Sequence, residues 1–241
     1  MAYDIATLGF NQQRWLLHSS NIPHRFLGME PADVIKKLGK FPKRIDTWIT
    51  DVLEGRVVMR TGGLGETGVG LLFDGEAGLG KTTHSVICLM ELVRRLPNDD
   101  AAIRKLFKYS SDDYGVMSRP IYYMTVPDFM NRKKAMIDAE PAERREMQLQ
   151  MEGFHGRSVM DHLNVRVLVL DDLGKELKSD YNAAGFDELL RARYDKGLPT
   201  IVTTNLDLSM WKQKYGEAMQ SFAHEAFQRI VIGETDLRRN N

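Results

Sequence analysis

Nine consecutive residues in this chain have the types and spacing that bind phosphate: Gly75-Glu76-Ala77-Gly78-Leu79-Gly80-Lys81-Thr82-Thr83. They fit the pattern G-x-x-x-x-G-K-[ST] of a phosphate-binding loop. Glycines in such a loop allow backbone angles that turn several amide N–H groups toward one anion. We expect Lys81 to reach the β- and γ-phosphates of a nucleoside triphosphate, and the Thr82 hydroxyl to hold Mg²⁺. Glu76 must then point outward, because its carboxylate would repel phosphate.

A pair of carboxylates ends the most apolar strand-like run of the chain. Residues 165–170 are valine or leucine at every position but one, and Asp171 and Asp172 follow them. Ligand-binding side chains gather at the carboxyl ends of parallel strands, so we expect this pair beside the phosphate loop. There Asp171 would bind Mg²⁺, directly or through water, and Asp172 would orient or deprotonate the attacking water. The alternative is that the two acids only cap a strand before a turn.

A further polar side chain, Asn205, ends the strand-like run at residues 199–205. At the same edge of a parallel sheet, its amide could hydrogen-bond the attacking water or the γ-phosphate. The alternative is an asparagine that only forms a turn.

Hydrophobic spacing indicates the elements that must position these side chains. Residues 69–73 predict a strand before the loop, and apolar residues at helical spacing from 86 to 96 predict a helix after it. Further strands are predicted at residues 121–125, 165–170, 199–205 and 229–232, and further helices at 10–18, 31–38, 45–53, 103–107, 128–139, 141–162, 182–194, 208–215 and 217–227. Alternating helices and strands indicate right-handed crossovers and a mainly parallel sheet.

Composition excludes little. The 241 residues suffice for one large α/β domain, or for one domain with a small appendage. Lys plus Arg and Asp plus Glu number 33 each, so net charge argues neither for nor against nucleic acid. Cys88 is the single cysteine and is expected to be a buried apolar residue, and no Cys/His cluster suggests zinc. Without a membrane-length apolar run or a signal-peptide core, we expect a cytoplasmic protein with no membrane partner.

The chain is predicted to have two parts. Residues 1–60 form a helical N-terminal segment that is a candidate for partner binding, and residues 61–241 form the nucleotide-binding domain. A glycine-rich link at residues 62–65 leads into the first strand of that domain. Trp15, Leu16 and Leu17 would either present an apolar helix to a groove on a partner or pack against the nucleotide-binding domain.

Several separated segments together resemble one family, the DnaC-type helicase loaders and their IstB-type transposition relatives in the AAA+ superfamily. The matching segments are residues 22–26 (IPHRF), the loop 75–83, residues 167–174 (VLVLDDLG), residues 193–194 (RY) with 199–205 (PTIVTTN), and residues 211–216. The loop and the acid-ended strand occur in many ATPases, whereas the other segments are more specific. The resemblance implies a P-loop AAA+ fold of the α/β class, with a five-stranded parallel sheet of order 5-1-4-3-2 between helices.

The same resemblance implies roles at the site. ATP and Mg²⁺ would be the cofactors, and Asn205 would be the first sensor residue. Members of the family work as ATP-dependent oligomers in which one subunit's arginine completes its neighbour's site, an effect of about 10³–10⁵ in rate in other systems. This sequence has Ser221-Phe222 where the family usually has an arginine after a serine. Arg229 is the nearest substitute, and Arg193 is another.

By this resemblance the protein would bind and hydrolyse ATP, weakly without a partner, and would bind single-stranded DNA. It would place a replicative hexameric DNA helicase during the initiation of replication. One alternative is an IstB-type helper ATPase that works with a transposase. A second is a small-molecule P-loop kinase, and a third is a nucleotide-binding adaptor that does not hydrolyse ATP.

Overall fold

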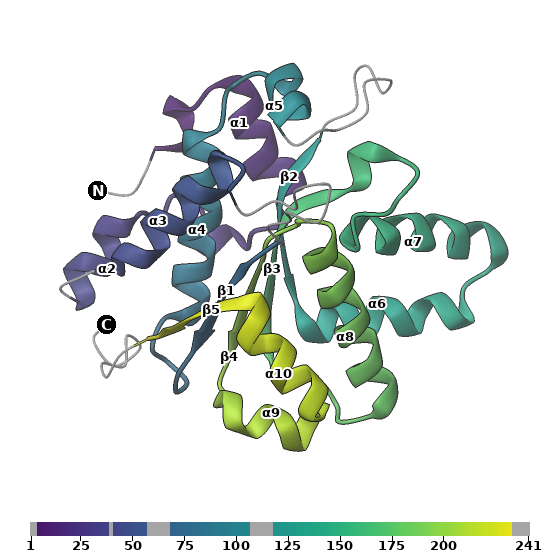
Figure 1. Ribbon diagram of the computed structural model, residues 1–241. Helices are drawn as coiled ribbons and strands as arrows, with labels where there is room; N and C mark the ends of the chain where they lie inside the picture. Colours follow the sequence, from purple (N-terminus) through teal and green to yellow (C-terminus); the bar gives the residue numbers. More distant parts are fainter. Residues whose placement is uncertain (1–3, 39–40, 57–67, 107–117, 233–241) are drawn as a thin grey trace.

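The computed structural model describes residues 4–38, 41–56, 68–106 and 118–232, in which five strands form one parallel sheet (Figure 1). The strands are β1 Gly70–Asp74, β2 Arg119–Thr125, β3 Val165–Leu173, β4 Thr200–Thr204 and β5 Phe227–Val231. The α-helices are α1 Phe10–Arg14, α2 Pro31–Leu38, α3 Lys43–Leu53, α4 Lys81–Arg95, α5 Asp100–Leu106, α6 Val126–Asp138, α7 Pro141–Phe154, α8 Asp180–Asp195, α9 Leu208–Tyr215 and α10 Glu217–Ala226. Shorter helical pieces are η1 Ile5–Thr7, the π-helical η2 Trp15–Ser19, η3 His24–Phe26 and η4 Asp161–Leu163.

The strand order along the sheet is β2-β3-β4-β1-β5, which confirms the predicted order 5-1-4-3-2. All four neighbouring pairs of strands are parallel. The almost wholly apolar sequences of β1 and β3 suit a parallel sheet, because helices cover both of its faces. The carboxyl ends of β1, β3 and β4 therefore lie together at one edge, where Asp74 pairs in register with Thr204.

The helix predicted at residues 141–162 is wrong beyond Phe154, where α7 ends. Gly156 follows in a left-handed conformation, with φ of +68°, and glycine in this conformation commonly stops a helix. The loop beyond it is stabilised by Asn164, whose side chain accepts from the Ser158 N–H at 2.9 Å and donates to the Ser158 carbonyl at 3.1 Å. The helices predicted at residues 31–38 and 208–215 are present with those bounds, and the other predicted helices and strands are present with shifted ends.

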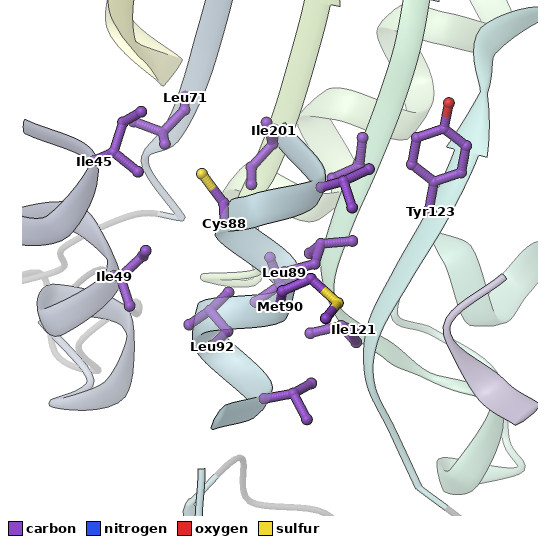
Figure 2. Close-up of a cluster of buried hydrophobic side chains, with 14 of the residues drawn as sticks. Ile45, Ile49, Leu71, Cys88, Leu89, Met90, Leu92, Ile121, Tyr123 and Ile201 are labelled. Carbon is purple, nitrogen blue, oxygen red and sulfur yellow. The ribbon is translucent and has the colours of Figure 1, made fainter. Parts of the chain in front are cut away.

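One face of the sheet is covered by α3, α4 and the amino-terminal segment. Figure 2 shows apolar side chains of α4 lying between α3 and the strands. Ile49 of α3, Leu89 of α4 and Ile201 of β4 are each fully buried in this cluster. Cys88 is buried there too, as predicted, and burial raises the pKa of its thiol, which leaves a packing role rather than a reactive one.

The opposite face is covered by α6 to α10 (Figure 1). Its core includes the buried side chains of Phe129, Phe186 and Trp211. Phe186 and Trp211 meet edge to face with ring centroids 6.4 Å apart, a favourable geometry for aromatic pairs. In the described parts of the chain, no helix is both long and apolar enough to cross a lipid bilayer.

The amino-terminal segment packs against the sheet and α4 instead of standing apart from them. Trp15 and Leu16 are buried in the same cluster as α4, whereas Leu17 is 45% exposed. The Ser20 carbonyl accepts a 2.7 Å hydrogen bond from the Tyr123 N–H, so the segment also caps the outer edge of β2. The glycine-rich link predicted at residues 62–65 lies outside the described residues.

Arg193 ties together the amino-terminal ends of β3 and β4, at the opposite end of these strands from Asp171. Its guanidinium is fully buried and donates to the Thr200 hydroxyl at 2.8 Å. It also donates to the carbonyls of Phe154, Val165, Arg166 and Pro199 at 2.7 to 3.1 Å. Arg193 is therefore a structural residue, and the expectation that it acts on a neighbouring subunit is wrong because its charge is enclosed within its own chain.

Arg193→Ala is expected to destabilise the fold by about 3 kcal/mol or more, because it leaves several buried acceptors without a donor. Arg193→Lys should recover little of this loss, since an ammonium lacks the planar fork of donors. Urea unfolding measures both effects, with Arg145→Ala as a control at an exposed arginine of α7. Equal midpoints for Arg193→Ala and Arg145→Ala would contradict this role.

Candidate nucleotide-binding site

The glycine loop connects β1 directly to α4, in the context that a phosphate-binding loop requires. Gly75, Gly78 and Gly80 have φ values of +140°, +90° and +84°, which side chains rarely tolerate. A Cβ at Gly75 would also lie 2.9 Å from the Ile232 carbonyl oxygen. Because α4 begins at Lys81, its free amide groups face the loop and favour an anion there. Glu76 is exposed, as the phosphate-binding role requires.

Lys81 is folded back onto the loop. Its ammonium donates to the carbonyls of Gly75 at 2.8 Å and Glu76 at 2.6 Å, and the residue is 7% exposed. A lysine in this position can exchange carbonyl acceptors for phosphate oxygens by rotating its side chain. The loop thus holds the cation on two of its own carbonyl groups.

Asp171 connects the loop helix to three strands. Its carboxylate accepts hydrogen bonds from Thr82 at 2.9 and 3.0 Å, from Tyr123 at 2.6 Å and from Thr203 at 2.5 Å. The residue is 2% exposed, and this burial raises the pKa of the Asp171 carboxyl although the three hydrogen bonds lower it. The structure therefore brings together the two residues predicted to hold the metal, Thr82 and Asp171.

The donors on Thr82 and Asp171 fit Mg²⁺. Both are hard oxygen ligands, which Mg²⁺ prefers. Within the described residues, no group of three or more His, Cys, Asp or Glu side chains could hold a metal alone. Mg²⁺ commonly takes only one or two protein ligands and completes its shell with phosphate oxygens and water, so two ligands suffice.

Asp172 occupies an irregular point of β3. Its φ is +63°, unusual for a residue with a side chain, and the pairing of β3 with β4 shifts register between Leu170 and Leu173. Such a bulge re-aims side chains at the end of a strand. The Asp172 N–H donates to the Thr203 hydroxyl at 3.0 Å, and its carboxylate pairs with the Lys175 ammonium at 2.7 Å.

Two adjoining cavities open beside these residues. One, of about 720 Å³, is lined by loop residues Ala77 to Thr83 except Leu79, and by Asp172, Lys175 and Asn205. The other, of about 930 Å³, shares Arg25, Thr82, Asp172 and Lys175 with the first and extends along the edge of β2. Both volumes lie in the range of small-ligand sites. We take the first as the nucleotide site, although it is the smaller, because the phosphate loop lines it.

The amino-terminal segment supplies the far wall of the nucleotide cavity. The charged residues Arg25, Asp33 and Lys37 line it together with Phe26, Met29 and Val34. Apolar and aromatic side chains of this kind suit the face of a nucleotide base. Sequence reasoning assigned them no role, although residues 22–26 were among the segments that carry the family resemblance.

Arg229 on β5 is bound to two carboxylates. Its Nε donates to Asp74 at 2.6 Å, its guanidinium also pairs with Asp74 through a second nitrogen, and it reaches Asp207 at 2.8 Å. These partners, with the hydrogen bond to Asp74 as the main cause, raise the pKa of the guanidinium. Arg229 does not line either of the two cavities described above. These contacts fasten β5 to the end of β1 and the start of α9.

Comparison with known proteins agrees with this geometry. Residues 128–232 match the family model of the IstB-like ATP binding protein. The chain is similar to the solved structure titled "Crystal structure of the DnaC helicase loader", with 21% identity, a TM-score of 0.51, and coverage of 88% of this chain and 100% of that one. It is also similar to "Crystal Structure of the DnaI", with 20% identity, a TM-score of 0.53, and coverage of 89% and 96%. A search of curated proteins finds no match.

The structural likenesses establish the fold, and the family match establishes an IstB-like region that includes β3, Asn205 and β5. The phosphate loop lies before that region, on the strand and helix that the shared fold requires. Over residues 128–232 this chain is therefore similar to the IstB-like ATP binding protein family, and it shares the fold of the DnaC and DnaI structures.

Proposed function

We propose that this protein is an ATPase that places a replicative DNA helicase on single-stranded DNA. The observation that carries the ATPase part is the contact of Thr82 with Asp171 beside a cavity lined by the phosphate loop. The loader part is supported by the similarity in fold to proteins whose titles name a helicase loader and DnaI.

In the proposed complex, the triphosphate of ATP lies on the amides of Ala77 to Thr83, and Lys81 turns from its carbonyl partners to the β- and γ-phosphates. The base lies toward Phe26 and Met29. Residues 25–37 thus complete the nucleotide site, while the exposed side chains of Phe10 and Leu17 are left for a partner.

Thr82 and Asp171 would hold Mg²⁺, which neutralises charge on the phosphates when bound. Asp172 accepts a proton from water while the water oxygen bonds to the γ-phosphorus. The bond from that phosphorus to the bridging oxygen breaks, so the products are ADP and inorganic phosphate. Asn205, exposed at the end of β4 and lining the cavity, orients the water or the γ-phosphate.

Arg229 is our candidate for the arginine that one subunit offers to its neighbour in an ATP-dependent oligomer. To do so, its guanidinium must exchange Asp74 and Asp207 for a phosphate. That exchange would link assembly of the oligomer to the release of Asp74, which ends β1 one residue before the loop.

A second candidate function is that of a helper ATPase for a transposase. It is favoured by the match of residues 128–232 to the IstB-like family model. Both functions use the same nucleotide site, and they differ in the protein that the ATP-bound form recruits.

Lys81→Ala is expected to weaken ATP binding about 10- to 100-fold, because a hydrogen bond between charged groups contributes about 1.5–3 kcal/mol. Titration with a fluorescent ATP analogue in the presence of Mg²⁺ measures the change. Lys178→Ala is a matched control, since Lys178 is an exposed lysine in the loop before α8. If a folded Lys81→Ala variant bound ATP with the affinity of the wild type, the loop would not be part of the ATP site.

Asp171→Asn is expected to abolish the Mg²⁺ dependence of ATP binding yet stabilise the nucleotide-free protein at high pH. Burial raises the pKa of Asp171 in the folded state above its value in the unfolded state. The protonated carboxyl therefore stabilises the fold at pH values below the unfolded-state pKa. This stabilisation is lost as pH rises through the folded-state pKa. An uncharged amide avoids that loss. Without metal, the melting temperature of the variant should therefore exceed that of the wild type by an amount that grows as pH rises. The opposite trend would be inconsistent with a buried Asp171 charge.

Asp172→Asn is expected to bind ATP but to slow its hydrolysis about 10²–10⁴-fold, the usual contribution of a general base. With ATP, this variant should therefore hold the hexameric helicase and single-stranded DNA on affinity beads, whereas Lys81→Ala should not. Capture of a transposase but not of the helicase would replace the leading function by the second candidate. Retention of neither protein would exclude both.

A further inference from the structure

We propose that Lys175 is a charge switch on Asp172. Without a nucleoside triphosphate its ammonium pairs with the Asp172 carboxylate, and with one bound it moves to the γ-phosphate and leaves that carboxylate to the attacking water. The inference rests on the proposed ATPase function and adds a residue to its site.

The ammonium lies where the two cavities join. Lys175 Nζ is 2.7 Å from Asp172 Oδ2, and the Lys175 N–H donates to the Asp172 carbonyl at 3.2 Å. Lys175, Asp172 and Thr82 line both cavities. Thr82 marks the metal end of the site, so a triphosphate on the loop places its terminal phosphate near this junction.

The backbone around Lys175 is anchored, so its side chain is the part that can move. Glu176, which is buried, accepts from the Gly174 N–H at 2.8 Å and pairs with the Lys214 ammonium at 2.9 Å. Tyr215 donates to Glu176 at 2.5 Å, and Lys214 also donates to the Gly174 carbonyl at 2.6 Å. Both residues that flank Lys175 are thus fastened to α9, while the Lys175 side chain is 53% exposed.

Charge gives the reason for the exchange. In the resting arrangement the ammonium donates to one Asp172 oxygen and so competes with water for the acceptor sites of that carboxylate. A γ-phosphate brings more negative charge than one carboxylate and offers three oxygens, so it competes for the ammonium. ADP lacks this phosphate and leaves the ion pair in place, so the base is released only when ATP is bound.

Lys175 also supplies a cation that Arg193 and Arg229 do not. Arg193 is buried among carbonyl groups at the amino-terminal ends of β3 and β4, and Arg229 is held by Asp74 and Asp207. Lys175 needs to give up only one exposed ion pair, and such pairs are weak, typically about 0–1 kcal/mol.

The test compares Lys175→Met with Lys178→Met, which removes the same charge from an exposed lysine three positions along the chain. Dissociation constants for ATP and ADP and the value of kcat are measured for both variants of the full chain. Lys175→Met is expected to lower the preference for ATP over ADP about tenfold, by loss of one charged contact, and to lower kcat. Lys175→Arg should restore both, and Lys178→Met should change neither.

The possible results separate the two proposals. If the wild type binds no ATP, the ATPase proposal fails, and this inference fails with it. If the wild type binds and hydrolyses ATP but Lys175→Met matches Lys178→Met, only the inference is overturned. A Lys175→Met variant with higher kcat and an unchanged preference for ATP would also overturn it, because Lys175 would then only restrain Asp172.

Discussion

The hydrogen bond between the Thr82 hydroxyl and the Asp171 carboxylate joins two parts of the chain that are 89 residues apart. It requires that β1 and β3 end at the same edge of the sheet, and therefore that these two strands run parallel. It also requires a buried carboxylate, which Tyr123 and Thr203 make tolerable by donating further hydrogen bonds. The strand order, the bulge at Asp172 and the glycine loop all serve to place these two oxygens together.

Stability and chemistry are separated along the same strands. At the amino-terminal ends of β3 and β4, the buried guanidinium of Arg193 donates hydrogen bonds to four carbonyls and a hydroxyl. At the carboxyl ends, Asp171 and Lys81 are buried ionisable groups whose partners can be exchanged for a ligand. This division is expected of a parallel sheet, in which ligands bind outside the carboxyl ends of the strands.

Sequence predicted the parts of the site that depend on local pattern. The loop, the strand ending in Asp171 and the sheet order followed from glycine spacing, from apolar runs and from the family resemblance. The sequence could not show that Arg193 is buried and therefore unable to reach a neighbouring subunit, because burial of a guanidinium depends on the tertiary structure. The lining residues Phe26 and Met29 were missed for the same reason, because no local pattern indicates that a segment 50 residues before the loop folds over it. The prediction of a helix that continues past Phe154 did not take into account that Gly156 can end a helix.

We propose that a triphosphate binds between the loop and Asp171 and there replaces the backbone carbonyls as the partner of Lys81. A crystal structure of the protein with Mg²⁺ and a non-hydrolysable ATP analogue tests it most directly. We expect phosphates on the amides of residues 77–83, Lys81 turned from Gly75 and Glu76 to phosphate oxygens, and Mg²⁺ between Thr82 and Asp171. A nucleotide bound elsewhere, with Lys81 still on the two carbonyls, would contradict the account.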